Sequence, residues 1–275
     1  FLLFNISGVR LFNSLNIGMT LVSGGGFIPT NNLNNIIVTN FQKIILIGSL
    51  FVSMFNFYLL FNIFDKKIVT REHKEDLYLL FLSLILILFV YFNDNSGFDL
   101  IISVISSMTN SGITLIESDN LSLYFLLITI IGGSLISNTS GIKLARFYIL
   151  LKITSSEILK LISPNSIINK TIFSSERKIT DDNIKISFLV FISFFLSLFI
   201  LSSFLILDNI GFEKSFKLSI LTLTNTVNSE LFNMENLNFA NLLTSSKISL
   251  IIFMIIGKIE LISIFLIFKK ILFKD

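Results

Sequence analysis

The chain alternates between long apolar stretches and short polar segments, and five of the apolar stretches are long enough to be helices. They span residues 41–64, 77–92, 121–152, 186–207 and 248–268. As a helix, the first would be about 36 Å long, enough to cross a bilayer core of about 30 Å. The third contains a break of glycine and small polar residues at 132–141. Because such a break cannot face lipid, we expect it to be buried in protein or to line a cavity.

Three shorter apolar segments lie between these stretches and end near Val22, Asn110 and Thr226. At roughly 13 residues each, they are too short to cross a bilayer. A half-length helix that runs into a polar loop is typical of a re-entrant hairpin. The three loops that follow, rich in glycine, serine, threonine or asparagine, are residues 23–27, 109–114 and 224–229.

The order full helix, short helix, polar loop, full helix therefore repeats along the chain, twice complete and once without its first helix. We predict an all-α polytopic membrane protein in which units of span, re-entrant pore helix, filter loop and span surround one pore. Residues 1–4 are expected to be the end of a truncated span.

Composition supports a membrane protein and removes most enzyme classes. The chain is 53% hydrophobic and only 14% charged, with a mean hydropathy of +0.84, whereas soluble domains carry about 25% charged residues. It has no cysteine and a single histidine, His73, so a thiol nucleophile and a cysteine or histidine metal cluster are excluded. His73 lies in a charged stretch, where we expect it to be a solvated loop residue. A dispersed net charge of +3 argues against nucleic-acid binding.

The basic residues predict the orientation. Most of the 21 lysines and arginines fall on one side of the predicted topology, and the positive-inside rule makes that side cytoplasmic. The three polar loops then lie toward the outer half of the membrane.

The short helices predict a cation site. The C-terminal end of a helix carries about half a negative charge, and extended carbonyls beyond it can replace the water shell of K⁺ or Na⁺. Gly26 and Gly112 could supply the positive φ that such a loop needs. A glycine-rich loop can also be a simple tight turn, but three loops at equivalent places favour the ion site.

Four segments resemble the Trk membrane subunit of the Trk/Ktr/HKT potassium-transporter superfamily. Residues 23–28 resemble its second filter loop, S-T-G-G-F-S, and residues 110–113 resemble its third, T-T-G-F. Residues 132–146 resemble its gate loop, G-G-x-x-x-S-T-x-G-I-K-x-x-R, with about one residue inserted, and residues 257–261 resemble G-R-x-E-L of its last span.

The resemblance implies four repeats around one pore, of which this chain contains the end of repeat two and all of repeats three and four. The implied divisions are 1–64 for repeat two, 65–76 for a cytoplasmic linker, 77–154 for repeat three with the broken gate helix, 155–183 for a second linker or surface helix, and 184–275 for repeat four.

It also implies the site residues. The expected selectivity filter, where K⁺ binds as the transported ion, consists of Ser23, Gly24, Gly25, Gly26, Asn110, Ser111, Gly112, Thr226, Val227 and Asn228. The expected gate consists of Gly132, Gly133, Ser137, Asn138, Thr139, Ser140, Gly141 and Lys258.

By the same resemblance the protein is a multi-pass protein of the bacterial inner membrane, embedded in lipid, without a covalently bound cofactor. The implied partners are a second copy of the membrane subunit and a cytosolic nucleotide-binding regulatory subunit.

Two positions depart from the family pattern. Asn228 stands where the fourth filter loop usually has glycine, and its extra oxygen predicts weaker discrimination between K⁺ and Na⁺. Lys258 stands where the family has arginine, and it lacks the planar fork of donors that the arginine guanidinium offers. We expect Lys258 to hold the gate loop across the pore without touching the filter, so its replacement would leave selectivity unchanged. Lys143 and Arg146 are interpreted either as cytoplasmic anchors or as gating residues.

The function predicted is passive K⁺ uptake through a carbonyl-lined filter past a mobile intramembrane loop. One alternative is a broken-helix secondary transporter for Na⁺-coupled or small-solute transport. Such a transporter needs carboxylates within the membrane, and the sequence offers Glu260. The other interpretation of Glu260 is a residue that packs within the fold. The second alternative is a non-conducting scaffold derived from a transporter, which Asn228 favours.

Overall fold

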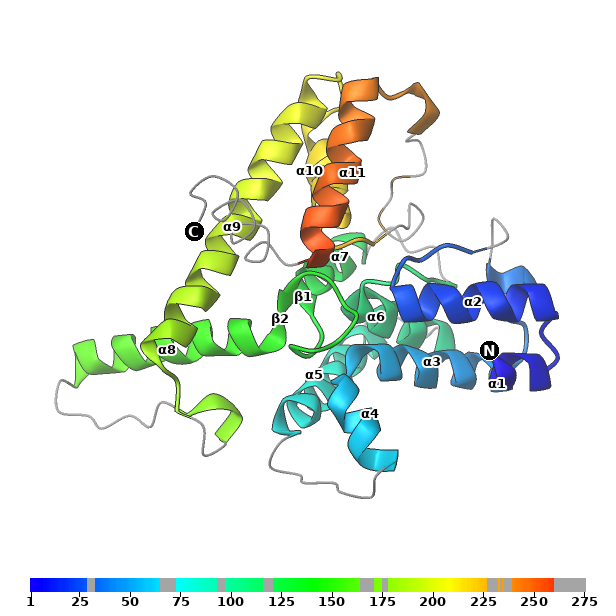
Figure 1. Ribbon diagram of the computed structural model, residues 1–275, viewed down its shortest axis with the longest axis horizontal. Helices are drawn as coiled ribbons and strands as arrows, with labels where there is room; N and C mark the ends of the chain where they lie inside the picture. The colour runs from blue at the N-terminus through cyan, green and yellow to red at the C-terminus, as the bar shows by residue number, and fades with distance from the viewer. Residues whose placement is uncertain are drawn as a thin grey trace, which may run out of the picture.

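Helices make up most of the described chain in the computed structural model (Figure 1). The structure describes residues 1–28, 33–64, 73–92, 97–115, 121–163, 171–174, 178–226, 232, 234 and 239–259. Within these ranges three short helices end at Ser23, Thr109 and Leu223, close to the places predicted for the ends of the short segments.

The first group of helices holds the short helix α2 and the span that follows it. Its elements are α1 (Leu2–Ile6), α2 (Leu11–Ser23), the 3-10 helix η1 (Leu33–Asn35), α3 (Asn40–Met54) and α4 (Phe57–Phe64). A capping box starts α3: Thr39 Oγ1 accepts from the Gln42 N–H, and the Gln42 side chain accepts from the Thr39 N–H. Gln42 also donates to the Ser7 carbonyl at 3.1 Å, which ties α3 to the turn before α2.

The second group contains the broken span. Its elements are α5 (Lys74–Tyr91), α6 (Phe98–Thr109), α7 (Ser122–Ile130), the strands β1 (Ile131–Gly132) and β2 (Ile142–Lys143), and α8 (Leu144–Ile162). The predicted break at 132–141 is present, as a loop closed at its base by parallel pairing of Ile131 with Ile142 and Gly132 with Lys143. Because α8 continues to Ile162, the first part of the stretch predicted as a linker is helical.

The third group contains the longest helix of the described residues. Its elements are the 3-10 helix η2 (Ile172–Ser174), α9 (Asp181–Ile206), α10 (Phe212–Leu223), the 3-10 helix η3 (Phe239–Asn241) and α11 (Thr244–Ile259). Thr180 caps α9 by accepting from the Asn183 N–H. The helices α9, α10 and α11 pack against one another.

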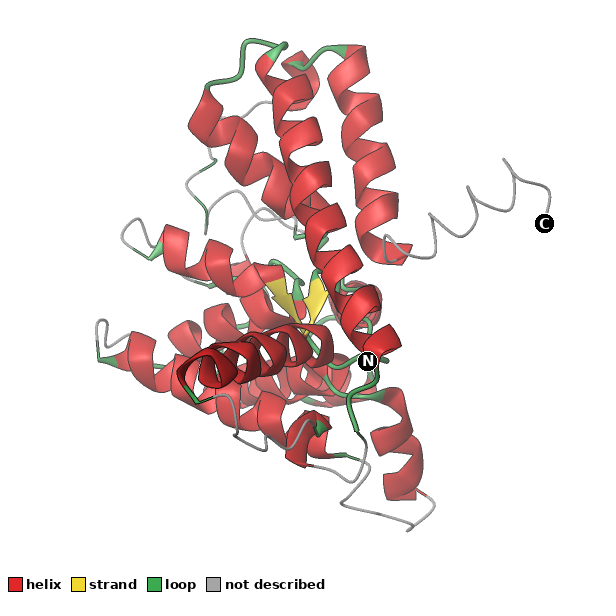
Figure 2. Ribbon diagram, turned by 90° about the vertical axis from the view of Figure 1, so that its left-hand side faces the viewer, coloured by secondary structure: helices red, strands yellow, loops and turns green. Residues whose placement is uncertain are grey.

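The gate loop lies where the three groups meet. Figure 2 shows the two strands at the centre, with helices on both sides. One apolar cluster joins the second and third groups through buried residues such as Phe125, Leu201 and Leu223. A second cluster joins α2 and α3 to α6 through Ile17, Leu46 and Ile102. Burial of these side chains, at about 25 cal/mol per Å² of apolar surface, fixes the groups around the loop.

The stretch 41–64, expected to be one helix, is broken into two, α3 and α4. The chain bends by 109° between α3 and α4, because the backbone groups at the break have partners elsewhere in the chain. The Met54 carbonyl accepts from the Ser134 N–H at 3.1 Å, and Asn56 N–H donates to the Asp76 carboxylate at 2.9 Å. The Phe57 N–H donates to the Ile136 carbonyl at 3.1 Å.

Within the described ranges, α9 alone is long and apolar enough to cross a membrane, and α3 with α4 meets the same criterion as a bent pair. The short helices α2, α6 and α10 contain 13, 12 and 12 residues, as predicted for segments too short to cross.

Candidate ion filter and gate

All three short helices end in the same backbone turn. The residue at which the chain turns is Gly24 or Asn110, directly after the helix, and Asn225, one residue further on; its left-handed φ is 61°, 57° or 54°. The next N–H in each case donates back to the carbonyl five residues earlier, at 3.2 Å for Gly25, 3.1 Å for Ser111 and 2.9 Å for Thr226. This is the Schellman arrangement, which turns the chain away from the helix axis. The three loops are therefore equivalent in their backbone as well as in their sequence.

A second left-handed residue follows in the two loops that the structure describes to this point. Gly26 has φ 69° and Gly112 has φ 66°, each two residues past the left-handed turn. A side chain is strained at such a φ, which explains glycine at both places. Val227 and Asn228, predicted for the fourth filter loop, lie outside the described residues.

Hydrogen bonds between buried hydroxyl groups stabilise two of the loops. Ser111 Oγ lies 3.0 Å from Ser106 Oγ and 3.1 Å from Thr109 Oγ1. Thr224 Oγ1 and Thr226 Oγ1 are 3.0 Å apart at the end of α10. Ser111 and Thr226 are almost fully buried, so these bonds hold the loops in one conformation without competition from water.

The gate loop depends on its glycines. A Cβ on Gly132 would lie 2.2 Å from the Ser140 carbonyl oxygen, and one on Gly133 would lie 2.6 Å from the Met54 oxygen. Gly141 has φ +75°, and a Cβ on it would lie 2.8 Å from the Ile130 carbonyl oxygen at the end of α7. Any larger residue at these positions would push the strands of the loop apart or lift the loop from α3.

Lys143 folds the gate loop from the inside. Its ammonium group donates to the carbonyl oxygens of Ser137 and Thr139 at 3.1 and 2.6 Å, and lies 3.3 and 3.2 Å from their hydroxyl oxygens. The side chain is buried. The interpretation of Lys143 as a cytoplasmic anchor is therefore wrong, because the ammonium group lies within the loop and satisfies its carbonyls.

Lys258 joins the gate loop to a filter loop. Its ammonium group donates to the Asn138 carbonyl at 2.6 Å and to the Ser23 carbonyl at 2.9 Å. Asn138 Nδ2 donates in turn to the Val22 carbonyl at 2.5 Å. The predicted contact with the gate loop is present. The expectation that Lys258 makes no contact with the predicted filter is wrong, because Ser23 is one of the residues predicted for that filter.

An acidic group holds the opposite side of the gate loop. Glu75, in the first turn of α5, accepts from the Leu135 N–H at 2.9 Å. Beside it, Asp76 lies 3.4 Å from His73 Nδ1, and His73 Nε2 lies 2.9 Å from Asn62 Nδ2. His73 is only 6% exposed, so the expectation of a solvated histidine is wrong: α4 and α5 enclose it.

Sequence reasoning missed Glu75, Asn225 and the internal role of Lys143. Only Asn225 left a signal, because it repeats Asn110 at the end of the equivalent short helix. Glu75 binds Leu135, which lies 60 residues away in the gate loop and is not indicated by the sequence around Glu75. Lys143 turns back onto Ser137 and Thr139, six and four residues before it. Glu260, Val227 and Asn228 lie outside the described residues, and Arg146 lines a small pocket behind the gate loop with Lys143.

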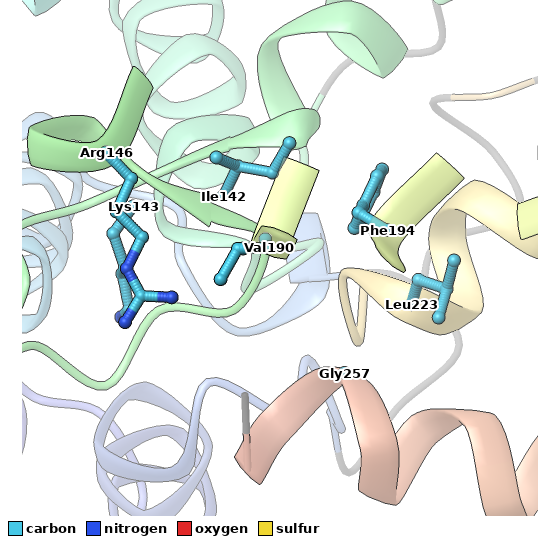
Figure 3. Close-up of a pocket in the computed structure, with 8 residues that line it drawn as sticks. Ile142, Lys143, Arg146, Val190, Phe194, Leu223 and Gly257 are labelled. Carbon is cyan, nitrogen blue, oxygen red and sulfur yellow. The ribbon is translucent and has the colours of Figure 1, made fainter. Parts of the chain in front are cut away.

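Gly257 lets α11 touch the end of α10, next to that pocket (Figure 3). A Cβ at Gly257 would stand 2.0 Å from the Leu223 carbonyl oxygen, so we expect Gly257→Ala to force α11 away from α10. Overpacking of this kind costs about 1–3 kcal/mol, which should lower the melting temperature of the purified protein by several degrees. Gly48→Ala on α3 is the control, because among the described residues no atom lies within 4 Å of its Cβ position. Equal melting temperatures for the two variants would contradict the close packing.

The chain repeats one order of elements: a helix, a short re-entrant helix, and a bent or broken helix. This order is that of all-α membrane transporter folds. No family model matches the chain. It is 29% identical over 298 aligned residues to a protein of Methanocaldococcus jannaschii named as an uncharacterized cation transporter, covering 99% of this chain. Its structure is similar to that of the potassium transporter TrkH from Vibrio parahaemolyticus, with a TM-score of 0.86 over 97% of the chain at 19% identity.

The chain has the fold of TrkH, which confirms the fold class and the family resemblance predicted from the sequence. It spans 57% of the length of the archaeal relative and 60% of the TrkH chain.

Proposed function

We propose that this chain forms part of an integral membrane protein that moves a monovalent cation, K⁺ above all, passively into the cell. The observation that carries the proposal is the identical left-handed turn at the end of three short helices, Gly24, Asn110 and Asn225. Each turn follows the partly negative end of a helix and leads into a loop whose carbonyls can coordinate a cation.

The gate loop supplies the second part of the proposal. Lys258 holds Asn138 of this loop against Ser23 of a filter loop, and its positive charge would also repel a permeating cation. Opening then requires this lysine to release one or both carbonyls. The names of the two relatives, a cation transporter and a potassium transporter, support transport rather than catalysis.

A homodimer and a cytosolic nucleotide-binding regulatory subunit belong to the proposal as well, on the family resemblance. Both are proposals about the whole protein, because this chain spans only part of the length of its two relatives.

The test is ion flux by the whole natural protein in lipid vesicles, with K⁺ and Na⁺ gradients imposed separately. We expect K⁺ to enter down its own gradient without Na⁺. K⁺ movement that requires a Na⁺ gradient would support the coupled transporter instead, and no flux of either ion in correctly inserted protein would support the scaffold.

A further inference from the structure

The asparagine at the end of each of the last two short helices reaches the next α-helix along the chain. Asn110 Nδ2 donates to the Thr129 carbonyl in α7 at 2.6 Å. Asn225 Nδ2 donates to the Met254 carbonyl in α11 at 2.9 Å. Since both asparagines also form the left-handed turn that begins the filter loop, each one connects a filter loop to the α-helix that follows it.

Both receiving carbonyls lie close to the gate. Thr129 is two residues before β1, at which the gate loop begins, and its carbonyl lies in the last turn of α7, where the helix itself provides no donor. Met254 is one turn before Lys258 on α11. Asn225 Nδ2 also lies 3.5 Å from Ser140 Oγ in the gate loop. A movement of the gate loop or of α11 would therefore pull on these amides.

In repeat two the filter loop is also bonded to an α-helix, but there the helix supplies the donor and the loop supplies the carbonyl. There the left-handed residue is Gly24, and a Cβ on it would stand 3.3 Å from Lys258 Nζ and 3.6 Å from the Asn138 oxygen. The lysine donates to the neighbouring Ser23 carbonyl instead. Thus a residue at the start of each loop is hydrogen-bonded to a helix next to the gate: Asn110 to α7, and Asn225 and Ser23 to α11.

We propose that Asn110 and Asn225 are positioning residues that couple the filter to the gate, so that the selectivity of the filter depends on the position of the gate. The inference rests on the proposed function. Selectivity for K⁺ requires carbonyl oxygens held at fixed places. Each asparagine sets the direction in which the chain leaves its short helix, and Asn110, at 1% exposed, has no room to adopt another rotamer without breaking its bond to Thr129.

The closest test replaces the amide without disturbing the backbone turn. Asn110→Gly and Asn225→Gly keep the positive φ, as Gly24 shows for the equivalent residue, but remove the bonds to Thr129 and Met254. Loss of one hydrogen bond of about 1 kcal/mol should reduce the ratio of K⁺ to Na⁺ flux by roughly threefold to tenfold in lipid vesicles. The matched control is Asn209→Gly, because Asn209 has φ 58° and lies exposed in the turn after α9.

The flux ratio separates coupling from a general structural role. A variant that merely inserts poorly loses K⁺ and Na⁺ flux equally and keeps the ratio of the parent. If a glycine variant fails to insert, Asn225→Asp replaces it, since aspartate also tolerates a positive φ but its carboxylate cannot donate to Met254. An unchanged ratio in an inserted Asn110 or Asn225 variant overturns the coupling while leaving transport intact. Absence of flux in the parent overturns the proposed function itself.

Discussion

Gly112→Ala is expected to reduce K⁺ uptake at least about tenfold while leaving the protein in the membrane. Gly112 has φ 66°, where a side chain costs about 1–3 kcal/mol of strain. The neighbouring Ser111 and Ile113 are 1% exposed, so the strained loop cannot shift sideways to relieve it. The carbonyls of the loop must rotate instead, out of the positions in which they would coordinate K⁺.

The measurement is growth at low K⁺ of a K⁺-uptake-deficient host that carries the whole protein, with the amount of inserted protein measured in parallel. Gly8→Ala is the control, because Gly8 has φ +90° in an exposed turn and, among the described residues, nothing lies within 4 Å of its Cβ position. It carries similar strain away from the loops. Normal growth of the Gly112 variant would remove this residue from the filter.

Lys258→Gln is expected to increase ion flux by roughly tenfold or more. A hydrogen bond from a charged donor contributes about 1.5–3 kcal/mol, and Lys258 makes two, to Asn138 and Ser23. Glutamine keeps a donor but loses the charge, which in the proposed mechanism both holds the loop and repels the permeating ion. Because one of the two lost partners is in a filter loop, we expect the ratio of K⁺ to Na⁺ flux to change as well.

Unidirectional K⁺ and Na⁺ flux in vesicles tests this expectation. Lys247→Gln is the control: Lys247 lies on the same helix and donates to the Ala240 carbonyl at 2.8 Å, far along α11 from the gate loop. Lys258→Arg should keep the gate closed, since arginine retains the charge and offers more donors. Reduced flux in correctly inserted Lys258→Gln protein would show that the lysine supports the fold rather than the closed gate.

The repeat of long and short helices was predictable from the sequence because helix length and the loops that end helices are local properties. Apolar runs of limited length and clusters of glycine and small polar residues were enough to place α2, α6 and α10 and the break at 132–141. The glycines of the gate loop, Gly132, Gly133 and Gly141, were also predicted, since they interrupt a run that is otherwise helical.

The tertiary structure alone decided which polar groups meet. Lys258 and Ser23 are 235 residues apart, and the bend after α3 forms because Ser134, Ile136 and Asp76 supply its hydrogen bonds. A buried polar group must find a partner wherever the packed helices bring one. Local sequence therefore determined where this chain leaves its helices. The packing of the three groups determined that His73 is enclosed and that the loops predicted as filter and gate are joined by hydrogen bonds from Lys258.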